Sequence, residues 1–175
     1  MPYYLIVCFF IILQISPVYA GMSAFFTPSK KCETIIVQQI NNVEKSIDAA
    51  IYAINNENIV EALKKAYIRG VKIRILTDRL QASNKNSKVR ELYYFGINVR
   101  VNSKHKIEHN KFAIFDSDSV LTGSYNWTES ASAKNSENCL LLNHNKKTVK
   151  EYIDRFNYLW KINSKKKSDI WFHTI

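Results

Sequence analysis

The stretch of sequence that decides the fold is residues 109–138, HNKFAIFDSDSVLTGSYNWTESASAKNSEN. It opens with His109 and Lys111, which share one face of an extended segment because side chains alternate along a strand. Ser124 and Asn126 repeat the same two-residue spacing further along. If the two segments pair as neighbouring strands, an imidazole, an ammonium, a hydroxyl and an amide meet around one anionic group.

These side chains suit the cleavage of a phosphodiester. The diester is anionic and repels nucleophiles, so a site must first neutralise its charge, which Lys111 and the amide donors of Asn126 can do. A neutral His109 can then attack phosphorus and form a covalent phosphohistidine, and a protonated histidine can give the leaving alkoxide its proton. Glu137 is placed in the sequence to orient an imidazole through its second nitrogen.

The same residues resemble the HKD motif of the phospholipase D superfamily. Three segments match in order: His109-x-Lys111-x4-Asp116, Gly123-Ser124-x-Asn126 and Lys134-Asn135-Ser136-Glu137-Asn138. A lone motif of this length can arise by chance, but chance does not explain three ordered matches. Segments 46–53 and 69–73 also look like the first helices and strands of that superfamily, so the resemblance covers nearly all of residues 21–175.

The resemblance implies a role for each of these residues. His109 serves as both nucleophile and general acid, and Glu137 orients it. Asp116 belongs to the motif, and we expect it to support strand geometry and local charge rather than to contact the substrate. The resemblance implies no metal ion and no cofactor. The phosphate-binding group that it implies consists of Lys111, Ser124 and Asn126.

Each residue also has an ordinary interpretation when it is taken alone. A single lysine or glutamate is usually a solvated surface residue, and Ser, Asn and Asp are common in turns. Tyr125 and Trp127 can line the cleft, although packing in the core or at its rim explains them at least as well. His105 has no partner in the motif, so we expect it on the surface.

One chain lacks a second imidazole for this reaction, because in-line displacement needs a nucleophile and an acid on opposite sides of phosphorus. The sequence holds four histidines, and only His109 has a lysine and an asparagine in its motif. A two-fold homodimer brings two copies of His109 face to face. Short members of the superfamily, which carry one motif as this chain does, are dimeric. They include periplasmic endonucleases, mitochondrial cardiolipin hydrolases and small secreted phospholipases D; Phe26-Thr27-Pro28 followed by Cys32 looks most like the secreted kind.

The rest of the chain alternates between helical and strand-like patterns. Helical spacing of apolar residues predicts helices over 32–45, 57–69, 84–94 and 148–160. Short apolar or alternating runs predict strands over 25–27, 47–54, 71–76, 97–101, 111–115, 120–124 and 138–142. This alternation predicts one α/β domain over residues 21–175, with a mixed central β-sheet flanked by helices as in phospholipase D-like proteins. We expect the lysine run 165–167 to be a solvated tail.

Residues 1–20 differ from the rest, since they contain no Asp, Glu, Lys or Arg. The apolar run 5–13 has the length of a signal-peptide core, and Val18-Tyr19-Ala20 offers small residues where a signal peptidase reads, which predicts cleavage after Ala20. The segment lacks a basic side chain, so an uncleaved N-terminal anchor stays the alternative. Either reading predicts a secreted or periplasmic domain.

Two cysteines remain after the predicted signal, Cys32 and Cys139. An oxidising compartment permits a disulfide between them, but the sequence alone does not bring them within reach. The chain has no CxxC and no Cys/His cluster, which argues against a structural zinc site.

The formal net charge of +10 favours polyanionic partners. Together with the basic segment 104–106 beside the motif, it favours nucleic acid as the substrate, bound through phosphates. The predicted secretion signal and the aromatic residues near the site favour a phospholipid instead. A non-catalytic polyanion-binding module is the third hypothesis, and it predicts the loss of a catalytic position, none of which is lost here.

Overall fold

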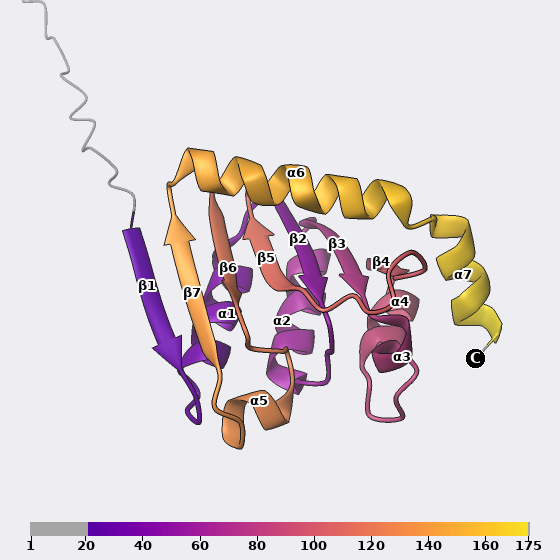
Figure 1. The fold of residues 1–175 in the computed structure, drawn as a ribbon, viewed down its shortest axis with the longest axis horizontal. Coiled ribbons are helices and arrows are strands. Elements are labelled where there is room, and N and C mark those ends of the chain that lie inside the picture. Colours follow the sequence, from indigo (N-terminus) through magenta and orange to yellow (C-terminus); the bar gives the residue numbers. More distant parts are fainter. Residues whose placement is uncertain (1–20, 175) are drawn as a thin grey trace, which may run out of the picture.

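The computed structural model describes residues 21–174, which fold around one seven-stranded sheet (Figure 1). The strands are β1 (Gly21–Phe26), β2 (Ser46–Ile51), β3 (Lys72–Thr77), β4 (Asn98–Val101), β5 (Lys111–Phe115), β6 (Ser119–Gly123) and β7 (Asn138–Asn143). The helices are α1 (Lys31–Asn42), α2 (Glu57–Ile68), α3 (Arg79–Ala82), α4 (Val89–Phe95), α5 (Glu129–Ala133), α6 (Lys146–Ile162) and α7 (Lys165–Thr174).

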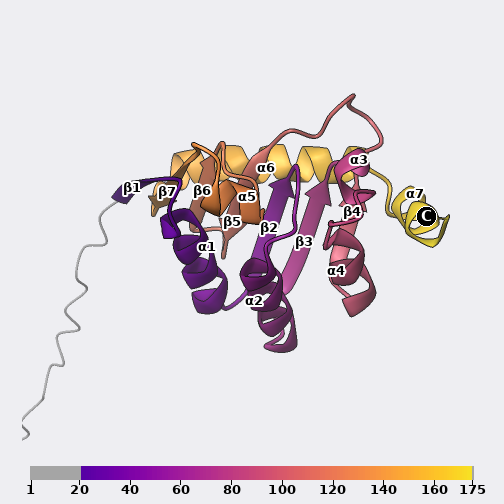
Figure 2. The same cartoon turned by 90° about the horizontal axis from the view of Figure 1, so that it is seen from below.

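The sheet is mixed, with the strand order β1-β7-β6-β5-β2-β3-β4. Strands β2, β3 and β4 are parallel, and helical crossovers join them, as parallel neighbours require. Strands β5, β6 and β7 form an antiparallel meander, and β5 pairs antiparallel with β2. Figure 2 shows α1, α2 and α4 on one face of the sheet and α6 across the other. The predicted α/β class and mixed sheet flanked by helices are confirmed.

The central strands are apolar on both faces because helices cover both faces. In β2, Ile47, Ala49 and Ile51 belong to the core beneath α1 and α2, which includes Ile36 and Leu63. The side chain between them, Ala50, faces a second core beneath α6, together with Phe112, Ile114, Phe156 and Leu159. This alternation fixes the register of β2, and therefore of the strands that pair with it.

Local signals set the ends of helix α2. The side chain of Asn56 accepts a hydrogen bond from the backbone N–H of Ile59 at 3.1 Å, as an N-cap does. Beyond the other end, Gly70 has a φ of 92°, a left-handed conformation that glycine adopts without strain. Gly96 closes α4 in the same way, with a φ of 108°.

Two local predictions were wrong. The helix predicted over 84–94 begins only at Val89, since Asn84 forms a turn in which its Oδ1 accepts from Asn86 N at 3.0 Å. Short polar side chains compete with the helical backbone in this way. The lysine run 165–167 is not a tail but the first turn of α7. That helix is held by Phe172, whose ring stacks on Tyr93 with centroids 3.9 Å apart.

A disulfide joins Cys32 of α1 to Cys139 of β7, with the Cα atoms 6.0 Å apart. The pair that the sequence left open is therefore within reach, and it ties the first helix to the strand that follows Glu137. Residues 1–20, where the signal peptide or anchor is predicted, lie outside the described residues. Within residues 21–174, every helix is too short or too polar to cross a bilayer.

Candidate active site

His109 and Lys111 lie at the start of β5, beside the end of β2. The antiparallel register sets Lys111 opposite Ile51, and Tyr52 N donates to Asn110 O at 2.9 Å. The Tyr52 ring meets the His109 imidazole edge-on, with centroids 4.6 Å apart, and Lys111 Nζ lies 4.9 Å from the centre of the same ring. Lys111 Nζ also donates to His109 O at 2.6 Å. Tyr52 therefore holds the imidazole and the ammonium in one place.

Two buried carboxylates fix the loop that carries His109. Glu108 is 2% exposed, and its Oε1 accepts from Asn110 Nδ2 at 2.6 Å. Asp78 is 3% exposed, and its Oδ2 accepts from Glu108 N at 3.0 Å. Its Oδ1 accepts from the first backbone N–H groups of α3, so the loop is tied to a helix start. The backbone at His109 is therefore fixed, although its ring is exposed to solvent.

Gly123 lets β6 and β7 approach closely. Its φ is 148°, and a Cβ at this position would lie 2.3 Å from Asn138 O, so a side chain cannot be accommodated. The close approach brings Ser124 against β7, where its N–H donates to Asn138 O at 3.1 Å. Ser124 Oγ donates to Glu137 Oε2 at 2.6 Å and accepts from Asn138 N at 3.1 Å. The Ser124 hydroxyl therefore binds the segment that carries Glu137, and its predicted contact with a phosphate stays a prediction.

The segment that carries Glu137 is held by residues far away in the sequence. Glu137 Oε1 accepts from Asn135 Nδ2 at 2.9 Å. Thr27 is 7% exposed; its Oγ1 donates to Asn135 O at 2.8 Å and accepts from Glu137 N at 2.9 Å. Within residues 21–174, the Glu137 carboxylate makes hydrogen bonds to Ser124 and Asn135 and none to His109. Orientation of His109 by Glu137 stays a prediction.

Asn126 carries a buried polar atom that lacks a partner. Its Oδ1 is shielded from solvent and makes no hydrogen bond within the described part of the chain, an arrangement that costs free energy. Its neighbours Tyr125 and Trp127 are 2% and 1% exposed, so they pack in the core and do not line the cleft. Burial raises the pKa of Tyr125 to about 12, and its hydroxyl lies 2.5 Å from Ser132 Oγ.

A pocket of about 360 Å³ opens beside His109 and Lys111. Arg155 lines its opposite wall, on α6. Burial lowers the pKa of Lys111, against the opposing attraction of Glu137 and Glu108. Because a partly desolvated ammonium is less screened by water, it attracts an anion more strongly. The pocket is therefore suited to an anionic group.

Asp116 lies at the other end of β5, in the turn to β6. Its carboxylate accepts from the backbone N–H groups of Glu44, Lys45 and Ser46 at 2.9, 2.7 and 2.9 Å. Burial would raise the pKa of Asp116, but the three backbone donors outweigh it and lower the pKa. Asp116 and Ser117 have φ values of 51° and 58°, as in a type I′ hairpin turn. Asp116 thus joins the turn to the start of β2 and lies apart from the pocket.

The other histidines lie elsewhere. His105 is exposed, as expected. His144 pairs with Asp118 at 2.7 Å, near the Asp116 turn. His173 contacts the ring of Tyr93 at the end of α7. Within residues 21–174, only His109 has a lysine beside it in a pocket.

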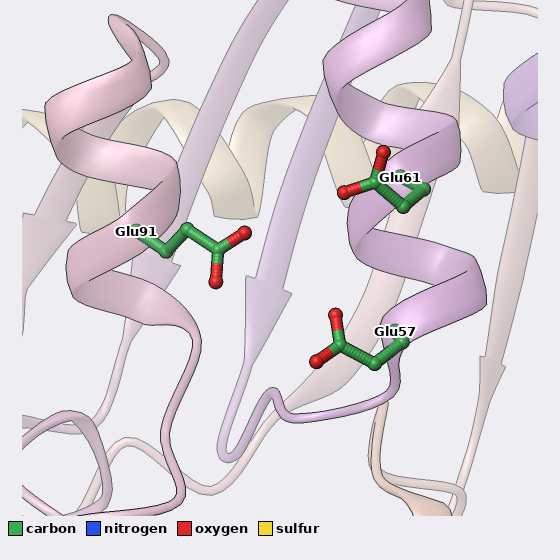
Figure 3. Close-up of side chains that lie close together, drawn as sticks. All are labelled: Glu57, Glu61 and Glu91. Carbon is green, nitrogen blue, oxygen red and sulfur yellow. The ribbon is translucent and has the colours of Figure 1, made fainter.

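A group of three carboxylates also stands out on α2 and α4. Figure 3 shows Glu57 and Glu61 on one helix facing Glu91 on the other. Lys64 pairs with Glu61 at 2.7 Å and with Glu91, and Lys88 pairs with Glu57 at 2.5 Å and with Glu91 at 3.1 Å. The hydrogen bond from Lys64 is the main cause that lowers the pKa of Glu91. This cluster is an ion-pair network that ties α4 to α2.

Sequence reasoning missed four residues of the site: Tyr52, Asp78, Glu108 and Thr27. Tyr52 was placed only as part of a predicted strand, and its neighbourhood depends on the pairing of β2 with β5. Asp78 and Glu108 have the local pattern of ordinary surface carboxylates, because their partners are 30 residues apart. Thr27 lay in a segment already singled out, but its contacts are more than 100 residues away.

Comparison with known proteins agrees with this geometry. The family model "Cardiolipin synthase, PLD-like domain" matches residues 36–160. The chain is 39% identical over 137 residues to a protein of Rickettsia prowazekii named phospholipase D, which covers 78% of this chain and 66% of that protein. It is 31% identical over 121 residues to a mitochondrial cardiolipin hydrolase of Chlamydomonas reinhardtii, covering 69% of this chain and 54% of that protein.

Among solved structures, the fold superposes on Nuc from Salmonella typhimurium, a phospholipase D family member, with a TM-score of 0.80 and 26% identity. The match covers 83% of this chain and 97% of that one. NucT from Helicobacter pylori shares the fold with a TM-score of 0.77. The chain spans only about three fifths of the length of the curated relatives named phospholipase D. Since the family model matches more than half of the chain, the chain belongs to the phospholipase D-like family, as its motif predicted.

Proposed function

We propose that the chain is a metal-independent phosphodiesterase that acts on nucleic acid through a covalent phosphohistidine. The observation that carries this proposal is the contact of His109 and Lys111 with one ring, that of Tyr52, beside a pocket lined by His109, Lys111 and Arg155. Asn126 and Tyr52 line the same neighbouring recess, and the amide of Asn126 is a group that can donate to a phosphate oxygen. Membership of the phospholipase D-like family supports phosphodiester chemistry.

The reaction runs in two steps. In the first, an imidazole nitrogen of His109 attacks phosphorus, the P–O bond to the leaving alkoxide breaks, and an imidazolium opposite gives the alkoxide its proton. In the second step, the opposite imidazole, which has given up its proton, accepts a proton from water. The water oxygen attacks phosphorus, and the P–N bond to His109 breaks. Lys111 and Asn126 hold the phosphoryl oxygens, whose charge grows in both transition states.

The opposite imidazole comes from a second copy of the chain. Within the described residues, no other histidine lies at the pocket, whereas a two-fold axis near His109 supplies one. The exposed ring of His109 supports this arrangement, since it is free to face a partner. Glu137 orients an imidazole once the shared site is assembled.

A mixing experiment tests the shared site. When wild-type chains exchange subunits with an equal amount of His109→Ala chains, half of the wild-type chains enter mixed dimers with one imidazole. Activity should then fall to about one half of that of the same wild-type chains alone. Unchanged activity after exchange, or full activity of a monomer in sedimentation, would show that one chain suffices.

We prefer nucleic acid as the substrate because of the positive charge of the chain. The chain has a net charge of +10, and the basic segment 104–106 is exposed directly before His109. Arg155 of α6 lines the pocket beside His109. A polyanion bound by such groups is held through its phosphates, with a steep dependence on salt.

A phospholipid is the second candidate. The relatives with 39–40% identity are named phospholipase D, and the 31% relative is named a cardiolipin hydrolase. The two candidates make opposite predictions for purified domain in EDTA, offered plasmid DNA in one arm and phosphatidylcholine or cardiolipin vesicles in the other. We expect cleavage of the DNA in the presence of EDTA. Release of headgroup alone would favour the lipid.

A non-catalytic polyanion-binding module is the third hypothesis, and the same assay addresses it. It predicts no turnover in either arm and equal DNA binding by wild type and His109→Ala. We also propose that the domain works outside the cytoplasm, in keeping with the predicted signal at residues 1–20. The Cys32–Cys139 disulfide supports this location, because such bonds persist in oxidising compartments.

A further inference from the structure

A second recess is linked to the first by Tyr52, which lines the second recess and whose ring contacts His109 of the first. It has a volume of about 250 Å³ and is formed by three segments: residues 52–55 after β2, residues 81–87 around the α3–α4 loop, and residues 126–135 after β6. The first two segments follow the carboxyl ends of β2 and β3, the position where open α/β sheets bind ligands, and the third follows the end of β6. We call this recess the amide groove.

The lining of the amide groove is polar and uncharged. None of its twelve lining residues carries a charge, and six carry a side-chain amide: Asn55, Gln81, Asn84, Asn86, Asn126 and Asn135. Hydroxyl groups supply most of the remainder. Such a lining offers many hydrogen-bond donors and acceptors and little apolar surface, so it suits a neutral polar ligand.

Two of these amides are free to bind. Asn84 Oδ1 accepts from Asn86 N, which leaves its Nδ2 without a partner in residues 21–174. The side chain of Asn86 is exposed and makes no hydrogen bond in that range. The loop itself is anchored, since Lys88 N donates to Ile54 O at 3.0 Å. Free polar groups on an anchored loop are pre-organised for a ligand.

The groove does not suit a phospholipid. A quaternary ammonium headgroup is bound by aromatic faces or carboxylates, but the one ring here, Tyr52, already has Lys111 Nζ near it. Acyl chains need apolar surface, and the apolar lining consists of Ala53 and Ile54, the latter only 2% exposed. Amide side chains instead form paired hydrogen bonds with the edges of nucleobases and bind sugar hydroxyls.

We propose that the amide groove is a nucleoside-binding subsite, which holds the sugar and base next to the scissile phosphodiester. The inference rests on the proposed nuclease function. The phosphate lies at His109, Lys111 and Asn126, the neighbouring nucleoside enters the amide groove past Tyr52, and the chain continues on the other side towards Arg155. The groove reads a base through hydrogen bonds, so its occupant is an unpaired nucleotide with exposed edges.

The test compares two diesters. Thymidylyl-thymidine has a sugar and base on each side of the phosphate, and bis(4-nitrophenyl) phosphate has neither. Asn86→Ala removes an amide without a partner, and Asn84→Ser shortens the other while keeping an oxygen that can accept from Asn86 N. Asn41→Ala, on the exposed side of α1, is the matched control.

We expect the double variant Asn84→Ser/Asn86→Ala to lower kcat/KM for thymidylyl-thymidine about tenfold, the effect of one or two hydrogen bonds. Its kcat/KM for bis(4-nitrophenyl) phosphate should stay within about twofold, as for the control. Thymidine monophosphate should inhibit wild type more strongly than inorganic phosphate does, and the double variant should lose that difference. An unchanged melting temperature excludes a folding defect.

The outcomes separate the two proposals. If wild type hydrolyses the chromogenic diester but not thymidylyl-thymidine, or if the double variant loses both activities equally, the nucleoside subsite is wrong while phosphodiester hydrolysis stands. The subsite is also wrong if the variant impairs hydrolysis of phosphatidylcholine vesicles as much as that of the dinucleotide. If wild type hydrolyses neither diester and no vesicle, the proposed function fails with it.

Discussion

The two ends of strand β5 carry the first and last residues of one motif, yet they are built in opposite ways. At the Asp116 end, three backbone N–H groups satisfy the carboxylate. At the His109 end, the imidazole is exposed and contacts the Tyr52 ring in an edge-on arrangement. The polar group is satisfied within the chain at one end of the strand and open to solvent at the other.

This difference shows that the residues of one sequence motif need not all belong to one functional site. A satisfied and partly buried carboxylate contributes to stability, because its loss leaves backbone donors without acceptors. Exposed or unpaired groups contribute little to folding and are available for chemistry. Substitutions at the two ends should therefore separate activity from stability.

His109→Ala should have the largest effect. It removes the proposed nucleophile, so turnover of DNA should fall by roughly 10⁴-fold or more. Stability should change by less than about 1 kcal/mol, because the ring is exposed. Steady-state kinetics and urea denaturation measure the two quantities. Substantial residual turnover would contradict the role of His109 as the nucleophile.

Lys111→Ala should follow, with a loss of about 10²- to 10³-fold in kcat, as expected for one key charge stabiliser. Arg155→Ala is the matched control, since it removes a cation from the opposite wall of the same pocket without touching the motif. We expect Arg155→Ala to raise KM by a larger factor than it lowers kcat. An equal loss of kcat in both variants would mean that the pocket needs only positive charge.

Asp116→Ala should reverse the pattern at the other end of the strand. It leaves three backbone N–H groups unsatisfied, so the free energy of unfolding should fall by about 2–4 kcal/mol. The folded fraction should keep wild-type kcat. Asp118→Ala, which loses only an exposed pair with His144, should cost less than about 1 kcal/mol. A loss of kcat with unchanged stability would place Asp116 in the chemistry.

The pH dependence sharpens the same contrast. The folded pKa of Asp116 is lowered by its backbone donors, so its contribution is fully present above the unfolded pKa, about 3.9, and is lost as pH falls through the folded pKa. The stability difference between wild type and Asp116→Ala should therefore be constant at neutral pH and shrink below about pH 4. Urea denaturation between pH 3 and pH 7 tests this, and a difference that persists in acid would contradict it.

Tyr52 should show the smallest effect. Tyr52→Leu removes the ring that contacts His109 and Lys111, and we expect kcat to fall about tenfold through poorer positioning. Tyr52→Phe keeps the ring and loses only the hydrogen bond from Gln81 Nε2 at 2.9 Å, so it should stay within about twofold. If both variants lose activity equally, the hydroxyl matters rather than the ring.

Much of the fold followed from local patterns. Strand β2 and helices α2 and α6 lie where apolar spacing predicted them, because helix and strand periods leave different apolar stripes. The errors arose where tertiary contacts overrode local propensity. The segment Asn84–Lys88 turns instead of continuing a helix, and Lys165 begins a helix whose Phe172 packs on Tyr93.

The candidate site divides in the same way. His109, Lys111 and Asn126 could be named from the spacing of the motif, although His109 lies just before β5 and Asn126 lies after the end of β6. Tyr52, Asp78 and Thr27 could not, because each acts through a partner at least 30 residues distant.

By itself, the sequence determined the family and the α/β class and named the candidate reacting side chains, because these depend on residue type and short-range period. Only the tertiary structure decided that Asp116 lies far from His109, that Cys32 reaches Cys139, and that six amides line one groove. Those facts depend on strand order and register, which are set by long-range packing of apolar faces on both sides of the sheet.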